Sequence, residues 1–205
     1  RANRIASTAL LLAAAFGLII LGAGLMFLDP FMRLLGATET MLPHAKAYAN
    51  YILIAAPFMV ISFVLNNLLR AEGKIKYAMI GISIGGLLNI GLDPLFIHTL
   101  GLGTAGAAIA TGISQLVSTV ILLAAYFRKG FTVVQPSVGQ IEISGRMLLD
   151  IFKTGLPALL RQGLASIASV ALNRSAMVYG DAAVAAMSIV SKVFMLIFST
   201  SLGIG

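Results

Sequence analysis

Long apolar runs that contain no charged residue constrain this chain more than any other feature of its sequence. Three such runs, Ile5–Leu28, Tyr48–Leu69 and Thr104–Phe127, have 22 to 24 residues each. At about 1.5 Å per residue, each would form roughly 33 Å of helix, enough to cross a hydrocarbon core about 30 Å thick. Because backbone groups in lipid must be hydrogen-bonded within their own segment, the runs predict transmembrane helices.

Three further apolar runs carry isolated polar residues. Tyr77–His98 contains Asp93, Leu156–Tyr179 contains two arginines, and the run that starts at Ala182 contains Lys192. Only 10% of the whole chain is charged, whereas a soluble domain usually has about 25%. The sequence therefore predicts an all-α membrane protein, a polytopic helical bundle with six predicted spans in the lipid bilayer.

Basic residues indicate which loops face the cytoplasm. When alternate loops are grouped, nine Lys and Arg residues fall on one side, and only Arg33 and Lys46 fall on the other. Cytoplasmic loops carry the excess of positive charge, so the first side is predicted to be cytoplasmic. The basic residues that give the net charge of +7 are distributed between the apolar runs and do not form one basic face, so we expect no nucleic-acid partner.

The longest connection predicts the domain organisation. We expect a first group of helices over 1–130, a cytoplasmic loop over 131–154, and the start of a second group over 155–205. The end of the loop, "ISGRMLLDIFKTG", fits either a short amphipathic surface helix or an extension of the next span. The chain lacks a starting Met and stops in an apolar run, so we expect further helices of the same protein to be missing.

Polar residues inside the predicted spans suggest a cation site. Asn89 precedes Asp93 by one helical turn, and the short link "TLGLG" returns the next helix antiparallel beside it. Depth along the two helices then places Thr111 next to Asp93 and Gln115 next to Asn89. Carboxylate, amide and hydroxyl oxygens suit Na⁺ or a proton better than a transition metal. The alternative is that Asp93 pairs with a basic residue of another helix.

Several segments resemble the multidrug and toxic compound extrusion (MATE) family, and the resemblance extends over essentially the whole chain. These segments are "LRAEG", "NIGLDPLFI", "GTAGAAIAT", "GLPALLRQG" and "YGDAAVAAMSIVSK". The resemblance implies a fold of twelve helices in two six-helix lobes, of which this chain would carry helices three to eight. It further implies a multi-pass protein of the bacterial plasma (inner) membrane that is a transporter and not an enzyme.

The resemblance also implies a mechanism. Members of this family export amphipathic or cationic compounds in exchange for Na⁺ or H⁺, with no cofactor besides that ion. Asn89, Asp93 and Thr111 match the positions that form the cation site of the first lobe in many members. Some branches carry a Glu where this chain has Ala165, so the chain looks closer to the DNA-damage-inducible branch. Asn173 lies near the place that a first-helix acid would occupy by pseudo-symmetry.

Other membrane-embedded residues have two interpretations each. Gln115, Arg161, Asn173 and Lys192 are candidates to line a cleft, while Arg161 could instead extend its charge to the cytoplasmic surface. The alternative function is a flippase for lipid intermediates in the same superfamily, which a lumen rich in Arg and Lys would favour. Apart from His98 at the edge of its span, the spans offer no His, Cys or paired acids for an intramembrane enzyme.

Overall fold

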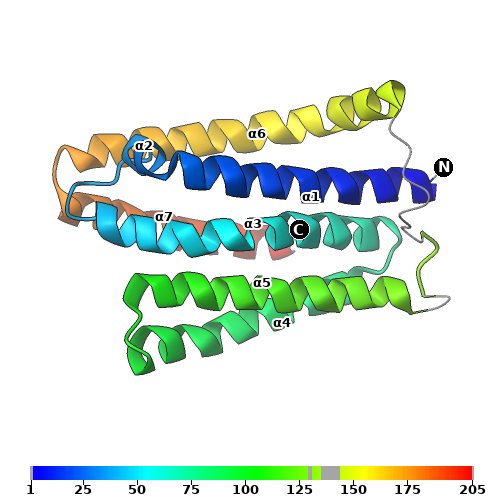
Figure 1. Ribbon diagram of the computed structural model, residues 1–205, viewed down its shortest axis with the longest axis horizontal. Coiled ribbons are helices and arrows are strands. Elements are labelled where there is room, and N and C mark those ends of the chain that lie inside the picture. Colours follow the sequence, from blue (N-terminus) through cyan, green and yellow to red (C-terminus); the bar gives the residue numbers. More distant parts are fainter. Residues whose placement is uncertain (1, 129–130, 135–143, 205) are drawn as a thin grey trace. The chain divides into compact units, whose positions relative to one another are not determined.

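A computed structural model describes residues 2–128, 131–134 and 144–204, without the side chains of residues 146, 147 and 196–204. Within these residues the regular elements are all helices (Figure 1), as expected for a polytopic membrane protein. The helices are α1 (Ala2–Met26), α2 (Leu28–Leu34), α3 (Leu42–Ala71), α4 (Ile75–Pro94), the π-helical turn η1 (Leu95–Thr99), α5 (Gly103–Phe127), α6 (Gly145–Met177) and α7 (Asp181–Ile204).

Five helices of the described chain are long and apolar enough to cross a membrane. They are Ala2–Met26, Leu42–Ala71, Ile75–Thr99, Gly103–Phe127 and Leu148–Met177. These correspond to the first five predicted spans. The sixth predicted span forms helix α7 (Asp181–Ile204). Among the described residues, α7 is not one of the five candidate membrane-spanning helices. The prediction of an all-α membrane protein is therefore confirmed.

One helix differs from the prediction. The short helix α2 lies in a segment that we predicted as loop, although Asp29 in its first turn and Arg33 in its last turn are favourable charges at helix ends. For the end of the long connection the sequence left two alternatives, and the structure agrees with an extension of the next span, because α6 runs without a break from Gly145 to Met177 with Pro157 inside it. The part of the predicted loop over 135–143 lies outside the described residues.

The chain forms two compact units. The first contains Arg1–Leu28 and Lys46–Ile151, and the second contains Asp29–Ala45 and Phe152–Gly205. In the first unit, the core cluster consists of Leu65 and Leu69 of α3, Ala78 of α4 and Leu122 of α5. The three helices that carry the candidate site thus share one apolar core.

Polar side chains add hydrogen bonds between these three helices. Asn66 Nδ2 of α3 donates to the carbonyl of Ala78 in α4 at 2.9 Å, and Ser118 Oγ of α5 donates to the carbonyl of Gly81 at 2.9 Å. Thr119 Oγ1 donates to the carbonyl of Phe58 in α3 at 3.0 Å. Within a membrane such bonds hold neighbouring helices together where the hydrophobic effect cannot.

Two glycines allow α4 and α5 to lie side by side (Figure 1). A Cβ added at Gly81 would lie 2.5 Å from Cδ2 of the buried Leu122. A Cβ at Gly85 would lie 3.0 Å from Cβ of Ser118 and 3.2 Å from the carbonyl oxygen of Ser114. Close helix approach of this kind requires small residues at the contact.

The second unit contains a turn that is joined to the start of α7. Gly36 has a φ of +94°, which favours glycine, and it lies against the backbone of Asn173 and Arg174 in α6. The hydroxyl groups of Thr38 and Thr40 both donate to the carboxylate of Asp181, the first residue of α7. These two bonds lower the pKa of Asp181 below its usual value of 3.8, and the bond from Thr38 has the larger effect.

We predict that this contact stabilises the protein in a pH-dependent way. Because the pKa of Asp181 is lowered in the folded state, the stabilisation is complete above the unfolded-state value and is lost as the pH falls through the folded-state value. Asp181→Ala should therefore lower the melting temperature of the full-length protein at pH 7 and lower it less below about pH 4. Thr38→Val combined with Thr40→Val should reproduce the loss at pH 7. An equal loss at both pH values would contradict the assignment.

Candidate functional site

Three of the predicted site residues come together between α4 and α5. Asn89 Nδ2 donates to Asp93 Oδ1 at 3.2 Å and to Thr111 Oγ1 at 3.4 Å. Thr111 Oγ1 donates in turn to the carbonyl of Ala107 at 2.9 Å. All three side chains are half-buried. The arrangement places a carboxylate, an amide and a hydroxyl oxygen within reach of one another on two adjacent helices.

The details differ from the pairing that depth predicted. Asn89, rather than Asp93, makes the hydrogen bond to Thr111, and it does not pair with Gln115 in the described hydrogen bonds. The π-helical turn η1 explains the shift, because a π-helix places more residues in each turn than an α-helix. Counting inward from the outer end at the α-helical rise therefore placed Asn89 and Asp93 too deep.

The Asn89 amide lies at the centre of this cluster. Its NH₂ group lies between Asp93 Oδ1 and Thr111 Oγ1, where two oxygens face a donor. Rotation of the amide would present Oδ1 to the same place, so that three oxygens of different type could surround Na⁺. The described residues contain no cluster of three His, Cys, Asp or Glu side chains that could hold a metal ion.

A break in regular helix lies directly beside this site. Pro94 ends α4 and the π-helical turn Leu95–Thr99 follows it. Proline has no N–H for the helical hydrogen-bond ladder, and π-helical turns frequently occur at functional sites. The carbonyl of Phe96 accepts a hydrogen bond from the backbone of Leu102, which closes the link to α5. The irregular turn thus connects the two helices that supply the site.

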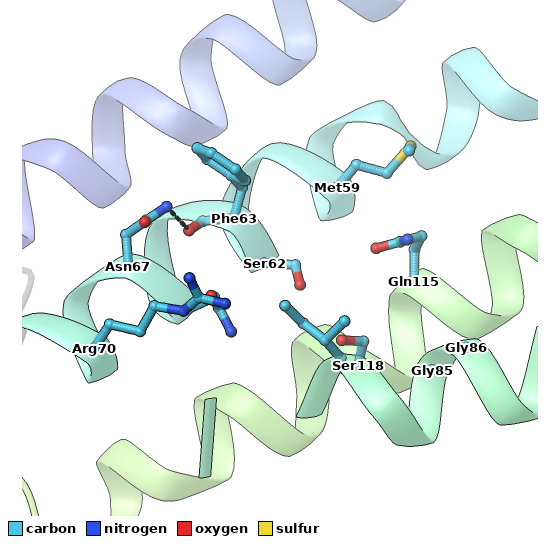
Figure 2. A pocket seen from close by; sticks show the side chains of 11 residues that line it. Met59, Ser62, Phe63, Asn67, Arg70, Gly85, Gly86, Gln115 and Ser118 are labelled. Atoms are coloured by element: carbon cyan, nitrogen blue, oxygen red, sulfur yellow. Dashed lines mark hydrogen bonds between the residues drawn. The ribbon is translucent and has the colours of Figure 1, made fainter. Parts of the chain in front are cut away.

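Gln115 lies one turn further along α5 and lines a groove between α3, α4 and α5 (Figure 2). The groove has a volume of about 340 Å³. Its polar side chains are Ser62, Asn66, Asn67 and Arg70 of α3, and Gln115 and Ser118 of α5. We did not predict this groove, because Arg70 was interpreted only as a topology signal. The repeated polar residues at one helical face, Ser62, Asn66 and Arg70, were the signal that could have identified it.

The remaining candidates lie in the second unit. Arg161 and Lys192 are exposed, and Asn173 is half-buried with its backbone against Gly36. The described structure gives them no contact with one another, and their predicted roles in lining a cleft stay predictions. Position 165, where some branches of the family carry a Glu, is an alanine in this unit.

Comparisons with known proteins decide the family. The family model MatE matches residues 1–95. The chain is 35% identical to a multidrug resistance MATE transporter in an inward-facing conformation, with a TM-score of 0.89 over 95% of this chain and 44% of that chain. The predicted resemblance to the MATE family is confirmed. A second MATE structure, determined in complex with Br-NRF, is 34% identical with a TM-score of 0.74 over 95% of this chain and 45% of that chain.

Curated MATE-type relatives are similar over most of this chain. Multidrug export protein MepA of Staphylococcus aureus (strain bovine RF122 / ET3-1) is 34% identical over 175 residues, which are 85% of this chain and 39% of the relative. MepA of Staphylococcus saprophyticus is 30% identical over 173 residues, 84% of this chain and 38% of the relative. The chain therefore spans less than half the length of the relatives it matches. The predicted branch of the family stays a prediction.

Proposed function

We propose that this chain is part of a cation-coupled antiporter that exports amphipathic or cationic compounds across a bacterial inner membrane. The observation that carries the proposal is the cluster of Asn89, Asp93 and Thr111 between two membrane helices. An ionisable group inside a membrane span is costly and usually functional. The similarity to multidrug export proteins supports the class of substrate.

The cluster suggests how an ion gradient could drive export. Asp93 has two states that suit a membrane: neutral with a proton, or charged with Na⁺ beside it. A change between these states alters which groups Asn89 and Thr111 contact, and the irregular turn after Pro94 gives α4 a place to bend. A compound that binds one conformation better than the other is then coupled to the ion.

The flippase alternative finds less support in these residues. A flippase for lipid intermediates would not need a carboxylate that is held between an amide and a hydroxyl of neighbouring helices. The basic residues of the predicted spans are Arg161, Arg174 and Lys192, and no basic residue lies within hydrogen-bonding distance of Asp93 among the described contacts. We therefore favour the antiporter.

We predict that Thr111→Val weakens cation binding more than it slows export. The substitution keeps the shape of the side chain and removes one neutral oxygen ligand, so the apparent affinity for Na⁺ or H⁺ should fall about tenfold. Uptake of a cationic dye into inverted vesicles, measured against ion concentration with the full-length protein, gives both values.

Thr119→Val is the matched control for this prediction. It removes a hydroxyl from the same helix, but that hydroxyl contacts the carbonyl oxygens of Gln115 and Phe58 and not the cluster. The ion dependence of this variant should resemble that of the wild type. If Thr111→Val leaves the ion dependence unchanged while Thr119→Val alters it, the cluster does not bind the coupling ion.

A further inference from the structure

We infer that the groove between α3, α4 and α5 selects compounds that carry a carboxylate, or another strong hydrogen-bond acceptor, over compounds that are purely cationic. The inference rests on the proposed function and refines its class of substrate. It is carried by the charge of the groove: among the described residues that line it, Arg70 is basic and none is acidic.

Arg70 is available to a ligand. It lies at the end of α3, its side chain is exposed, and in the described part of the chain it forms no ion pair. Figure 2 shows its guanidinium extending toward the middle of the groove, in the direction of Ser62. A guanidinium is always charged and presents a planar fork of N–H groups that matches a carboxylate with two parallel hydrogen bonds.

The rest of the groove fits an amphipathic compound. Its volume of about 340 Å³ lies within the range of small-molecule sites, roughly 300 to 1,000 Å³. Met59, Phe63 and Ile82 supply apolar surface. Figure 2 shows Arg70 and Gln115 at opposite ends of the groove. A ligand with an acceptor at one end and an apolar ring system would find partners for both parts.

Several polar groups of the groove already have partners and so shape it without binding a ligand. The donors of Asn66 and Ser118 bond to backbone carbonyls of α4, and Asn67 Nδ2 donates to the carbonyl of Phe63 at 2.8 Å. These bonds occupy the Ser118 hydroxyl hydrogen and one of the two amide hydrogens of each asparagine. Arg70 is therefore the charged donor in the groove, and it repels a ligand that has only positive charge.

The test compares two dyes that differ at one group. Rhodamine 110 carries a free carboxylate, and rhodamine 123 is its methyl ester. The second dye is therefore a cation that lacks the negatively charged carboxylate. Binding to the purified full-length protein is measured by fluorescence polarisation in detergent without an ion gradient. Wild-type protein should bind rhodamine 110 more tightly, and Arg70→Gln should weaken that binding about tenfold while changing rhodamine 123 binding less than about twofold.

Two further variants separate the guanidinium from general effects. Lys76→Gln removes the same charge from an exposed position nearby that does not line the groove, and it should leave the binding of both dyes unchanged. Arg70→Lys should recover part of the rhodamine 110 affinity, because it restores the charge without the planar fork. Unchanged melting temperatures would show that the variants fold.

Three outcomes would overturn the inference. They are equal affinity of wild type and Arg70→Gln for rhodamine 110, equal weakening by Lys76→Gln, or loss of the Arg70 effect only when phosphatidylglycerol is added, which would assign the groove to an anionic lipid headgroup. Because the measurement needs no ion gradient, it is independent of coupling through Asp93. The coupling proposal is tested separately by gradient-driven export in Asp93→Asn, so the failure of either proposal would be seen by itself.

Discussion

Asp93→Asn in the full-length protein is expected to reduce gradient-driven export roughly 30- to 150-fold, while leaving the protein folded. The amide has nearly the same shape as the carboxylate and can still accept a hydrogen bond from Asn89 Nδ2, as Asp93 Oδ1 does at 3.2 Å. It can neither take up a proton nor compensate the charge of Na⁺. A loss of about 2 to 3 kcal/mol in the interaction with the ion corresponds to a factor of roughly 30 to 150.

The measurement is dye uptake into inverted vesicles under an imposed H⁺ or Na⁺ gradient. Asp29→Asn is the control, because it removes a carboxylate from α2, outside the five candidate spans. Export by the control should match the wild type. If Asp93→Asn exports dye at the wild-type rate under the same gradient, Asp93 has only a structural role.

Gly85→Val is expected to have the second large effect, because it separates the two helices that form the site. A Cβ at this position already meets Ser118 Cβ at 3.0 Å and the Ser114 carbonyl oxygen at 3.2 Å, and valine adds two methyl groups beyond it. Overpacking of this kind costs about 1 to 3 kcal/mol. Since Gly85 lies one turn from Asn89, the separation should also break the bond between Asn89 and Thr111 at 3.4 Å.

Gly91→Val is the matched control for this substitution. It makes the same chemical change in the same helix, but a Cβ at Gly91 has no neighbour within 4 Å. Gly85→Val should lower the melting temperature and the apparent ion affinity together, whereas Gly91→Val should change neither by much. Equal effects of the two variants would mean that loss of helix flexibility, and not the contact between α4 and α5, is responsible.

The sequence predicted the elements that form the site because two local signals agreed. Charge-free runs of bilayer length marked the helices, and the short link before Gly103 required α5 to return beside α4. These two facts bring Asn89, Asp93 and Thr111 close in space. That they bind a cation stays a prediction, since proximity alone does not distinguish an ion site from a set of hydrogen bonds between helices.

The details that the sequence did not predict depend on contacts that periodicity cannot show. The π-helical turn after Pro94 shifted the register between α4 and α5, and no simple sequence rule gives that turn. The sequence left open whether α6 extends back beyond Pro157, because proline often ends a helix, and in the structure it does. The groove with Arg70 arises from three helices at once, so it becomes visible only when their packing is known.

Ion binding to the purified protein tests the central claim most directly. Binding of ²²Na⁺ to the detergent-solubilised full-length protein should saturate, should be displaced by protons as the pH falls, and should be lost in Asp93→Asn. In Thr111→Val it should be weaker by about tenfold but still present. Binding of ²²Na⁺ that is unchanged in Asp93→Asn, with protons competing as they do in the wild type, would contradict the assignment of Asn89, Asp93 and Thr111 as the coupling site.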